Sequence, residues 1–315
     1  MIDPGERRLL LGTMNFGKRT PEDEAIAIVR RAIDLGIRHV DTANAYNDGA
    51  SERIVGKAVR TSRERAQIAT KVGFGRASGK PEGLSRGRIV AACDESRARL
   101  GIDRIDLYYL HVPDPSTPLE ESVGAMGELV SSGRIAAWGV SNYASWQIVD
   151  MEHIAARLGV PPPVASQQLY NVLIRQLDVE YFRFAKAHPI HTAVYNPLAG
   201  GLLTDRGLWN EGADVAGTRF DRNSLYRGRY WHDAMKRRAL DVAHVAAECG
   251  LPIAQLAYAW ALARPGVDSV LAGPATALHL EVAARAADAP LAADVMARLD
   301  ALHVAWSGTE STYAR

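Results

Sequence analysis

Several apolar runs of the sequence end in a side chain that can take part in chemistry. Asp41 ends one such run and Tyr46 follows it by five residues, while Lys71 ends QIATK and His111 ends IDLYYLH. Three further runs end in polar or aromatic residues, namely Ser141 with Asn142, Gln167, and Tyr195. If these runs are parallel strands of one sheet, the side chains meet at one edge, where such folds place their active sites.

The first four of these residues have the chemistry of a proton donor and its supporting groups. A buried lysine beside a carboxylate such as Asp41 stays protonated, and the charge of Lys71 is expected to lower the pKa of a nearby phenol. Tyr46, with an unperturbed pKa of about 10, could then act as a general acid near neutral pH. The imidazole of His111 can orient or polarise a carbonyl group. Together they predict protonation of a carbonyl oxygen.

Each of the four residues, taken alone, has an ordinary explanation. A single aspartate at the end of a strand is usually a helix N-cap or a turn former, and a single tyrosine is usually an amphipathic residue at a rim. A single lysine or histidine at a strand end is usually structural. Their recurrence at successive strand ends favours the functional interpretation.

Strand-like and helix-like segments alternate along the chain. Such alternation requires parallel strand pairing and right-handed crossovers, and eight units of this kind close into a barrel. No linker or low-complexity tract interrupts residues 1–315. We therefore predict one domain, a (β/α)8 TIM barrel of the α/β class. Its eight strands are expected at residues 8–13, 38–42, 67–72, 105–111, 135–141, 164–168, 191–195 and 267–272.

The alternation breaks after the seventh predicted strand. Residues Gly207–His232 form a long insertion that is rich in Gly, Asn and Arg. Loops of this length inside compact domains are usually functional or disordered. We expect a substrate loop here rather than a core element, and a C-terminal tail, SGTESTYAR, after the last helix.

Composition excludes several classes of partner. Lys and Arg total 37 and Asp and Glu total 36, which gives a formal net charge of +1. A charge this balanced does not favour binding to nucleic acid or to anionic membranes. No apolar run approaches the roughly 20 residues of a transmembrane helix, and MIDPGERR lacks a signal-peptide core. Cys93 and Cys249 cannot form a disulfide framework, and the histidines show no metal-ligand spacing. We expect a cytoplasmic protein without a metal.

The motifs around these residues resemble those of the aldo-keto reductase family. DTANAY, IATK with Lys71, and LYYLH resemble the family's tetrad of Asp, Tyr, Lys and His. SNYASW, YNPLAGGLLT, NSLYRGRYW and the C-terminal Tyr-x-Arg resemble its aflatoxin-aldehyde and succinic-semialdehyde reductase branch. Bacterial sugar and natural-product reductases share much of this second set. The resemblance runs nearly from end to end.

The resemblance implies a role for each residue of the tetrad and a cofactor. Tyr46 would donate the proton, Lys71 and Asp41 would tune it, and His111 would position the carbonyl. Ser141, Asn142 and Gln167 would hold the nicotinamide carboxamide, and the ring of Tyr195 would stack on the nicotinamide. The remaining implied contacts to the dinucleotide are Asn196, Pro197, Leu198, Gly200, Leu202, Arg206, Arg219, Gly273, Thr276 and His279.

The expected cofactor is NADPH, and NADH remains open. Ala275 stands where this branch tends to have a hydroxyl, and Ala283 replaces an expected Asn near the adenine. No GxGxxG follows a strand to open a helix, so a Rossmann nucleotide site is not supported.

The resemblance also suggests a substrate site. Tyr226, Arg229 and Arg315 match positions that line the pocket in this branch, and guanidinium groups pair bidentately with carboxylates. A small carbonyl substrate, such as a carboxylated aldehyde, follows from this. A homodimer is left open.

Three other functions are compatible with the same motifs. The chemistry could run in reverse, in an NAD(P)-dependent sugar or lactol dehydrogenase, or act on a keto-sugar of a natural-product pathway. The barrel could be a non-catalytic cofactor-sensing regulatory subunit, like the potassium-channel partners that share it. It could also be an aldolase with a Schiff base on Lys71, although Asp41 should keep that lysine protonated and non-nucleophilic.

Overall fold

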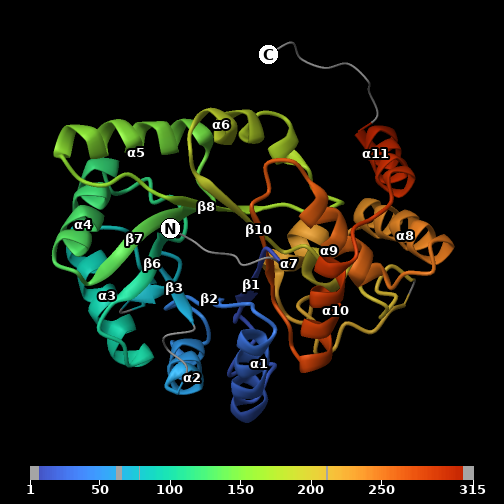
Figure 1. The fold of residues 1–315 in the computed structure, drawn as a ribbon, viewed down its shortest axis with the longest axis horizontal. Coiled ribbons are helices and arrows are strands. Elements are labelled where there is room, and N and C mark those ends of the chain that lie inside the picture. Colours follow the sequence, from blue (N-terminus) through green and yellow to red (C-terminus); the bar gives the residue numbers. More distant parts are fainter. Residues whose placement is uncertain (1–6, 62–65, 78, 211, 308–315) are drawn as a thin grey trace.

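The chain folds into a closed barrel of parallel strands surrounded by helices (Figure 1). This computed structural model describes residues 7–61, 66–77, 79–210 and 212–307. The barrel strands are β1 (Leu9–Gly12), β2 (His39–Asp41), β3 (Gln67–Val72), β6 (Ile105–Leu110), β7 (Ile135–Ser141), β8 (Ala165–Leu169), β9 (His191–Tyr195) and β10 (Ser269–Ala272). Around the barrel they follow the order β1-β10-β9-β8-β7-β6-β3-β2. The predicted (β/α)8 barrel is confirmed.

The connections between the strands carry the helices. Pro21 precedes the helix that begins at Glu22, and the acidic side chains of its first turn suit the positive end of the helix dipole. The helices are α1 (Glu22–Asp34), α2 (Ala50–Val59), α3 (Arg86–Leu100), α4 (Leu119–Ser131), α5 (Ser145–Leu158), α6 (Tyr181–Ala187), α7 (Ser224–Tyr230), α8 (Asp233–Glu248), α9 (Ile253–Ala263), α10 (Ala277–Asp288) and α11 (Ala293–Ser307), with short 3₁₀ turns η2 (Gln176–Asp178) and η3 (Ala199–Gly201).

The predicted strands agree with the observed ones to within one or two residues at each end. The last strand, predicted at 267–272, begins at Ser269. Composition does not fix such ends, because they depend on which residues of the neighbouring strands pair. A small antiparallel hairpin in the Gly-rich segment after β3, made of β4 (Arg76–Ala77) and β5 (Lys80–Pro81), was not predicted.

Apolar side chains fill both faces of the barrel wall. Those that point outward pack under the helices, and a smaller cluster fills the interior. The interior cluster is made of Leu10, Ala69, Leu107, Tyr109, Ala165, Ala193 and Leu271. Side chains two residues apart on a strand share a face, so Lys71 projects to the same side as Ala69, into the barrel. This alternation aims the polar strand ends at the barrel mouth.

The insertion at residues 207–232 is part of the packed structure, and the prediction that it holds no core element was wrong. It contains α7, and Phe220, Tyr226 and Tyr230 are all buried. A Cβ placed on Gly200 would lie 2.7 Å from Cδ1 of Tyr226, so α7 packs tightly on η3. Burying each large aromatic side chain contributes roughly 1.5–3 kcal/mol, which outweighs the polar composition of the segment.

Other sequence-based expectations concern cysteines, metals and membranes. Cys93 is buried and Cys249 is partly buried, and both are free thiols. Among the residues that the structure describes, no three His, Cys, Asp or Glu side chains are grouped so as to hold a metal ion. Within the same residues no single helix is long and apolar enough to cross a bilayer, and only the pair α8 and α9, bent by 96°, passes on length and composition.

Candidate active site

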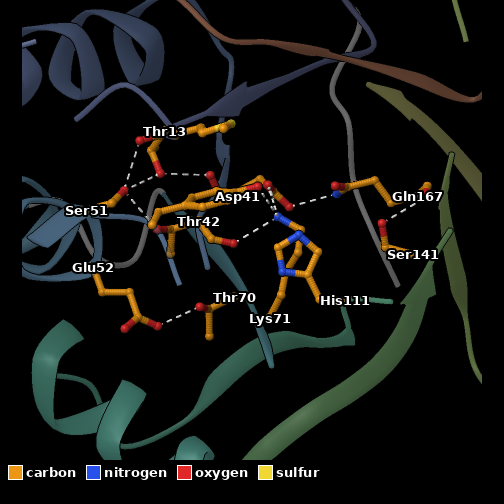
Figure 2. Close-up of polar contacts among 12 residues, drawn as sticks. Thr13, Asp41, Thr42, Ser51, Glu52, Thr70, Lys71, His111, Ser141 and Gln167 are labelled. Atoms are coloured by element: carbon orange, nitrogen blue, oxygen red, sulfur yellow. Dashed lines mark hydrogen bonds and ion pairs between the residues drawn. The ribbon is translucent and has the colours of Figure 1, made fainter. Parts of the chain in front are cut away.

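The carboxylate of Asp41 and the ammonium of Lys71 form a buried ion pair at the mouth of the barrel (Figure 2). The two side chains are 1% and 0% exposed, and they come from the last residue of β2 and from β3. Lys71 also donates to the carbonyl oxygen of Thr42 at 2.9 Å. A buried charge is tolerated when a partner and further hydrogen bonds compensate it, and both are present here.

Tyr46 lies in the loop between β2 and α2 with its hydroxyl group beside the same ammonium. The distance from Nζ of Lys71 to the hydroxyl oxygen is 3.5 Å, and Nζ lies 5.1 Å from the centre of the phenol ring. The ring of His111, just after β6, meets the Tyr46 ring edge-on at 5.9 Å. The four residues, which come from three separate segments of the sequence, are therefore adjacent in space.

Burial and nearby charges shift the pKa values of Lys71 and Tyr46 in opposite directions. Burial disfavours the charged form of Lys71, but Asp41 and the phenol together more than offset it, so the pKa of Lys71 is raised. Burial also raises the pKa of Tyr46, and the nearby ammonium lowers it only in part. The net direction for Tyr46 is upward, which corrects the expectation that Lys71 would bring its pKa below the ordinary value. The phenol is thus protonated at neutral pH.

The imidazole of His111 is neutral at physiological pH. Burial is the main cause and the charge of Lys71 adds to it, so the pKa of His111 lies well below its ordinary value. Its Nδ1 atom is buried and has no hydrogen-bond partner in the described part of the chain. The half-exposed ring of Phe74 lies 5.1 Å away. A neutral imidazole can donate one hydrogen bond to a carbonyl oxygen without adding charge.

A hydroxyl cluster behind the ion pair fixes the loop that carries Tyr46 (Figure 2). The hydroxyl of Ser51, in the first turn of α2, lies 2.7 Å from that of Thr13 and 2.9 Å from that of Thr42. Thr13 in turn donates to the carbonyl oxygen of Asp41 at 3.0 Å. This cluster was not predicted, because the sequence offers only a serine at the start of a predicted helix as a signal.

Gln167 contacts the ion pair directly. Its Nε2 donates to Oδ2 of Asp41 at 2.8 Å, and its backbone carbonyl accepts from the hydroxyl of Ser141 at 3.0 Å (Figure 2). The carboxylate of Asp41 is therefore held on both oxygens, by Lys71 and by Gln167. The resemblance implied only a cofactor contact for Gln167, so its bond to the tetrad is an additional finding.

Asn142 and Tyr195 form the next part of the mouth. Asn142 has a positive φ of 65° and donates through Nδ2 to the carbonyl oxygen of His111 at 3.0 Å. The hydroxyl of Tyr195, at the end of β9, donates to Oδ1 of Asn142 at 2.7 Å. Burial raises the pKa of Tyr195 to about 12, against the effect of nearby Arg229. These contacts bring Asn142, His111 and Tyr195 to one rim.

A cationic region lies where β1 and β10 end. Arg219 donates to the hydroxyl of Tyr226 at 2.7 Å and reaches Sδ of Met14 at 3.7 Å. A Cβ on Gly273 would lie 3.2 Å from Nη2 of Arg219, so glycine keeps the end of β10 open to this guanidinium. Tyr226 is buried, with 5% of its surface exposed.

Arg19 belongs to the same region and was not identified from the sequence. It lies in the loop after β1 and donates to the carbonyl oxygen of Thr218 at 2.7 Å, which ties that loop to the insertion. Burial lowers the pKa of Arg19, and the charge of Arg219 lowers it further. The guanidinium groups of Arg19 and Arg219 repel each other, and that of Arg219 lies beside Gly273 at the end of β10. Such a pair of cations is suited to binding a phosphate group.

The segment after β9 is folded beneath α7. Asn196, with φ of 65°, accepts from the backbone N–H of Gly200 at 2.9 Å and donates to the hydroxyl of Tyr230 at 2.9 Å. Pro197 and Leu202 are buried and Leu198 is partly buried. Arg206, another implied contact to the dinucleotide, is exposed, and its Nη2 donates to the carbonyl oxygen of Ala216 at 3.5 Å.

The remaining predicted residues lie at the start of α10 and in the insertion. Thr276 is the N-cap of α10 and accepts from the backbone N–H of His279 at 3.4 Å. Thr20 donates to the carbonyl oxygen of Ala275 at 3.0 Å, so this helix start adjoins the loop after β1. Arg229 is partly buried on α7. Arg315 lies outside the described residues.

The loop after β6, which follows His111, is held by the carboxylate of Asp114. Asp114 accepts from the backbone N–H groups of Leu84 at 2.8 Å and Ser116 at 2.9 Å, and from the hydroxyl of Thr117 at 2.7 Å. Partial burial opposes ionisation, but these hydrogen bonds lower the pKa of Asp114 to about 2. Asp114 therefore links the loops after β3 and β6.

We expect Asp114 to contribute stability that depends on pH. Its folded pKa is depressed, so the contribution is complete above the unfolded pKa of about 3.9 and is lost as pH falls toward the folded pKa of about 2. Between pH 5 and pH 2.5, the free energy of unfolding measured in urea should therefore fall by roughly 1–2 kcal/mol more in the wild type than in Asp114→Asn, allowing for partial solvent screening. Parallel losses in the two proteins would contradict this assignment.

The comparison with known proteins decides the family. The profile of the aldo/keto reductase family matches residues 8–304. The chain belongs to the aldo/keto reductase family. The aldo/keto reductase is thus an oxidoreductase that acts on carbonyl groups, as the tetrad motifs predicted. The three tetrad motifs lie at the barrel mouth described above, at the ends of β2, β3 and β6.

Relatives of this aldo/keto reductase carry two kinds of name. It is 32% identical over 316 residues to human aldo-keto reductase family 7 member A3, which covers 94% of this chain and 93% of that protein. Human aflatoxin B1 aldehyde reductase member 2 is also 32% identical over 316 residues, with 94% and 86% covered. A probable voltage-gated potassium channel subunit beta from Arabidopsis thaliana is 33% identical over 281 residues, with 87% and 85% covered. The resemblance to the aflatoxin-aldehyde reductase branch is confirmed.

Proposed function

We propose that this aldo/keto reductase is an NADPH-dependent carbonyl reductase in which Tyr46 protonates the substrate oxygen. The observation that carries the proposal is the position of the Tyr46 hydroxyl, 3.5 Å from a lysine ammonium that is paired with Asp41 at the barrel mouth. The nicotinamide cofactor supplies the hydride when it is bound. The residues of the chain supply the proton, the orientation and the charge.

Each residue of the tetrad has a distinct part in this mechanism. The neutral phenol of Tyr46 donates its proton to the oxygen of an aldehyde or ketone, and the ammonium of Lys71 stabilises the phenolate that remains. Asp41 keeps that ammonium charged and in place. His111 donates a hydrogen bond that orients the carbonyl, and its neutrality avoids a second positive charge beside Lys71.

Tyr46 can serve both directions of the reaction. Burial raises its pKa, so the phenol is present as the acid at neutral pH and can protonate a carbonyl oxygen. The sugar or lactol dehydrogenase alternative would use the same residue as a base, so the direction is decided by the equilibrium and by the cofactor preference. The experiment is a screen of NADPH oxidation across small aldehydes, dicarbonyls and keto-sugars, and no turnover with any of them would refute the proposal.

The residues at the mouth fit a nicotinamide dinucleotide. Asn142 and Gln167 present amide groups at the ends of neighbouring strands, which suits a carboxamide, and the ring of Tyr195 offers an aromatic face. Arg19 and Arg219 supply two guanidinium groups for phosphates. These basic residues support NADPH over NADH, and tighter binding of NADH than of NADPH would overturn that preference.

The substrate class rests on the insertion. Arg229 is near enough to Tyr195 to oppose the rise of its pKa, which supports a position of this guanidinium at the barrel mouth. A guanidinium there supports a carbonyl substrate that bears a carboxylate, such as a small semialdehyde. Arg315 would add a second such contact. Arg229→Gln should raise the Michaelis constant for carboxylated aldehydes and leave that for neutral aldehydes unchanged. The same Michaelis constants in the variant as in the wild type, for both classes of aldehyde, would contradict this assignment.

A second candidate function is a cofactor-sensing regulatory subunit. The observation that favours it is the likeness to proteins named as voltage-gated potassium channel beta subunits, at 33% identity over 87% of the chain. The two functions share cofactor binding and differ in turnover. A complete and connected tetrad supports catalysis, and the NADPH oxidation screen separates the two.

We expect Arg19→Gln to weaken NADPH binding about tenfold, because it removes one of two guanidinium groups from the phosphate region. Quenching of tryptophan fluorescence on titration with NADPH measures the dissociation constant. Arg53→Gln is the matched control, since Arg53 lies on neighbouring α2 and its side chain donates to the carbonyl oxygen of Asp48 at 3.2 Å. An equal effect of the two substitutions, or no effect of Arg19→Gln, would remove Arg19 from the site.

A further inference from the structure

We propose that Glu82 is a positioning residue that holds the loop of Tyr46 and the loop after Lys71 in fixed relation and so sets the carbonyl-binding wall at Phe74. The proposal rests on the carbonyl reductase function put forward above. Glu82 follows β5 and lies outside the tetrad and the cofactor residues. Its side chain is 4% exposed.

The carboxylate of Glu82 accepts hydrogen bonds from both loops. Nδ2 of Asn44 donates to Oε1 at 2.6 Å. The backbone N–H groups of Gly73 and Gly75 donate to Oε2 at 2.8 Å and 3.3 Å. Nε of Arg88, on α3, donates to Oε1 at 3.0 Å. A nearly buried carboxylate with this many donors is a rigid junction rather than a surface ion pair.

The donors lie next to the residues that do the chemistry. Asn44 precedes Tyr46 by two residues, and its own backbone N–H donates to the carbonyl oxygen of Lys71 at 3.2 Å. Gly73 and Gly75 are the two neighbours of Phe74. Glu82 thus connects the residue pair that transfers the proton with the aromatic ring beside it.

The segment around Phe74 needs an external anchor. Gly73 has φ of 106°, a conformation that other residues rarely adopt, and Gly75 lacks a side chain that could pack. Glycine loses more conformational freedom on folding than any other residue, so a Gly-Phe-Gly segment does not order itself. Glu82 fixes the amide on each side of Phe74, whose half-exposed ring faces His111 at 5.1 Å.

A purely structural role in α3 does not account for these contacts. Arg88, the helix partner of Glu82, also binds Glu95 through two hydrogen bonds of 2.8 Å each. Arg88 therefore keeps a carboxylate partner without Glu82. The contacts that Glu82 alone supplies are those to Asn44, Gly73 and Gly75, and all three belong to the barrel mouth.

The test is the selectivity of the full-length enzyme between a bulky aromatic aldehyde, 4-nitrobenzaldehyde, and a small aliphatic one, propanal. Glu82→Gln should lower kcat/KM for the aromatic aldehyde about tenfold, chiefly through KM, and change propanal much less, because the wall at Phe74 is no longer fixed. The NADPH dissociation constant should stay within about twofold of the wild type. Arg88→Gln, which removes one contact of Glu82 and leaves the other three, should keep the wild-type selectivity.

Phe74→Ala should change selectivity in the same direction, and combining it with Glu82→Gln should add little, because both act on one wall. Glu82→Asp keeps the charge and should recover part of the selectivity. Equal losses for both aldehydes, the same loss in Arg88→Gln, or additive effects of Glu82 and Phe74 would overturn the proposal.

A measurement without turnover separates this inference from the proposed function. Amide hydrogen exchange on the enzyme without substrate should be at least tenfold faster at Gly73 and Gly75 in Glu82→Gln than in the wild type or in Arg88→Gln. Unchanged exchange would refute the role of Glu82 even if the enzyme reduces carbonyls. Faster exchange in Glu82→Gln, together with a wild type that reduces no carbonyl, would refute the proposed function and leave the role of Glu82 in place. If Glu82→Gln does not fold, Glu82→Asp and Phe74→Ala carry the same comparison.

Discussion

Tyr46→Phe lowers kcat/KM for aldehyde reduction by roughly 10²–10⁴-fold, the range that general acid catalysis contributes. The substitution removes only the hydroxyl that lies 3.5 Å from the ammonium of Lys71, and leaves the ring that packs against His111. Steady-state NADPH oxidation at saturating cofactor measures the loss. The NADPH dissociation constant should not change by more than about twofold, because the hydroxyl belongs to the proton donor.

Tyr143→Phe is the matched control for this experiment. Tyr143 is also buried near the barrel mouth, and its hydroxyl donates to the carbonyl oxygen of Val112 at 3.2 Å rather than to the tetrad. It loses one neutral hydrogen bond, which contributes about 1 kcal/mol of stability, and should keep wild-type turnover. A similar loss of turnover in both variants would mean that the effect comes from packing and that Tyr46 is not the acid.

Lys71→Met has the second large effect, on both catalysis and stability. It removes the charge that stabilises the phenolate of Tyr46, so kcat/KM should also fall by roughly 10²–10⁴-fold. It leaves Asp41, which is 1% exposed, as a buried carboxylate without its cation. An uncompensated buried charge costs about 3–5 kcal/mol, which urea unfolding at pH 7 can measure.

The double variant Asp41→Asn, Lys71→Met distinguishes the two effects. It removes both charges, so most of the lost stability should return, because neither ion remains buried alone. Turnover should stay low, because the ammonium is still missing. Recovery of turnover in the double variant, or full stability in Lys71→Met, would contradict the role of this ion pair.

The architecture and the tetrad were predictable because they follow from short-range patterns in the sequence. Segments with helical periodicity alternate with short apolar runs, and eight such units close into a barrel of parallel strands. Strand alternation then determines which side chains face inward, and Lys71 shares a face with Ala69. Residues at the C-terminal ends of parallel strands meet at one mouth wherever they stand in the sequence. The convergence of Asp41, Lys71 and His111 follows from that rule.

The parts that were missed depend on tertiary contacts. Glu82 and Ser51 have polar side chains in segments that read as an ordinary loop and an ordinary helix start, and only the folded chain brings Asn44 and Thr13 to them. The direction of the Tyr46 pKa was wrong because the sequence shows the neighbouring charge and not the depth of burial. Burial is set by the fold as a whole, and here it outweighs the charge of Lys71.

The insertion was misjudged for a related reason. Its Gly, Asn and Arg content is typical of an exposed loop, yet Phe220, Tyr226 and Tyr230 are buried, and the rings of Phe220 and Tyr226 lie against Gly200 of η3. A few aromatic side chains contribute more to packing than the average composition of a segment suggests. Arg19 was missed because its partner Arg219 lies 200 residues further along the chain.

Stopped-flow mixing of the NADPH-bound enzyme with 4-nitrobenzaldehyde tests the proton-donor role of Tyr46 most directly. We expect the wild type to oxidise its bound NADPH in a single turnover and Tyr143→Phe to do so at a similar rate. We expect Tyr46→Phe to bind NADPH equally well but to oxidise it roughly 10²–10⁴ times more slowly. Oxidation at the same rate in Tyr46→Phe, or none in the wild type with any aldehyde, would contradict this role.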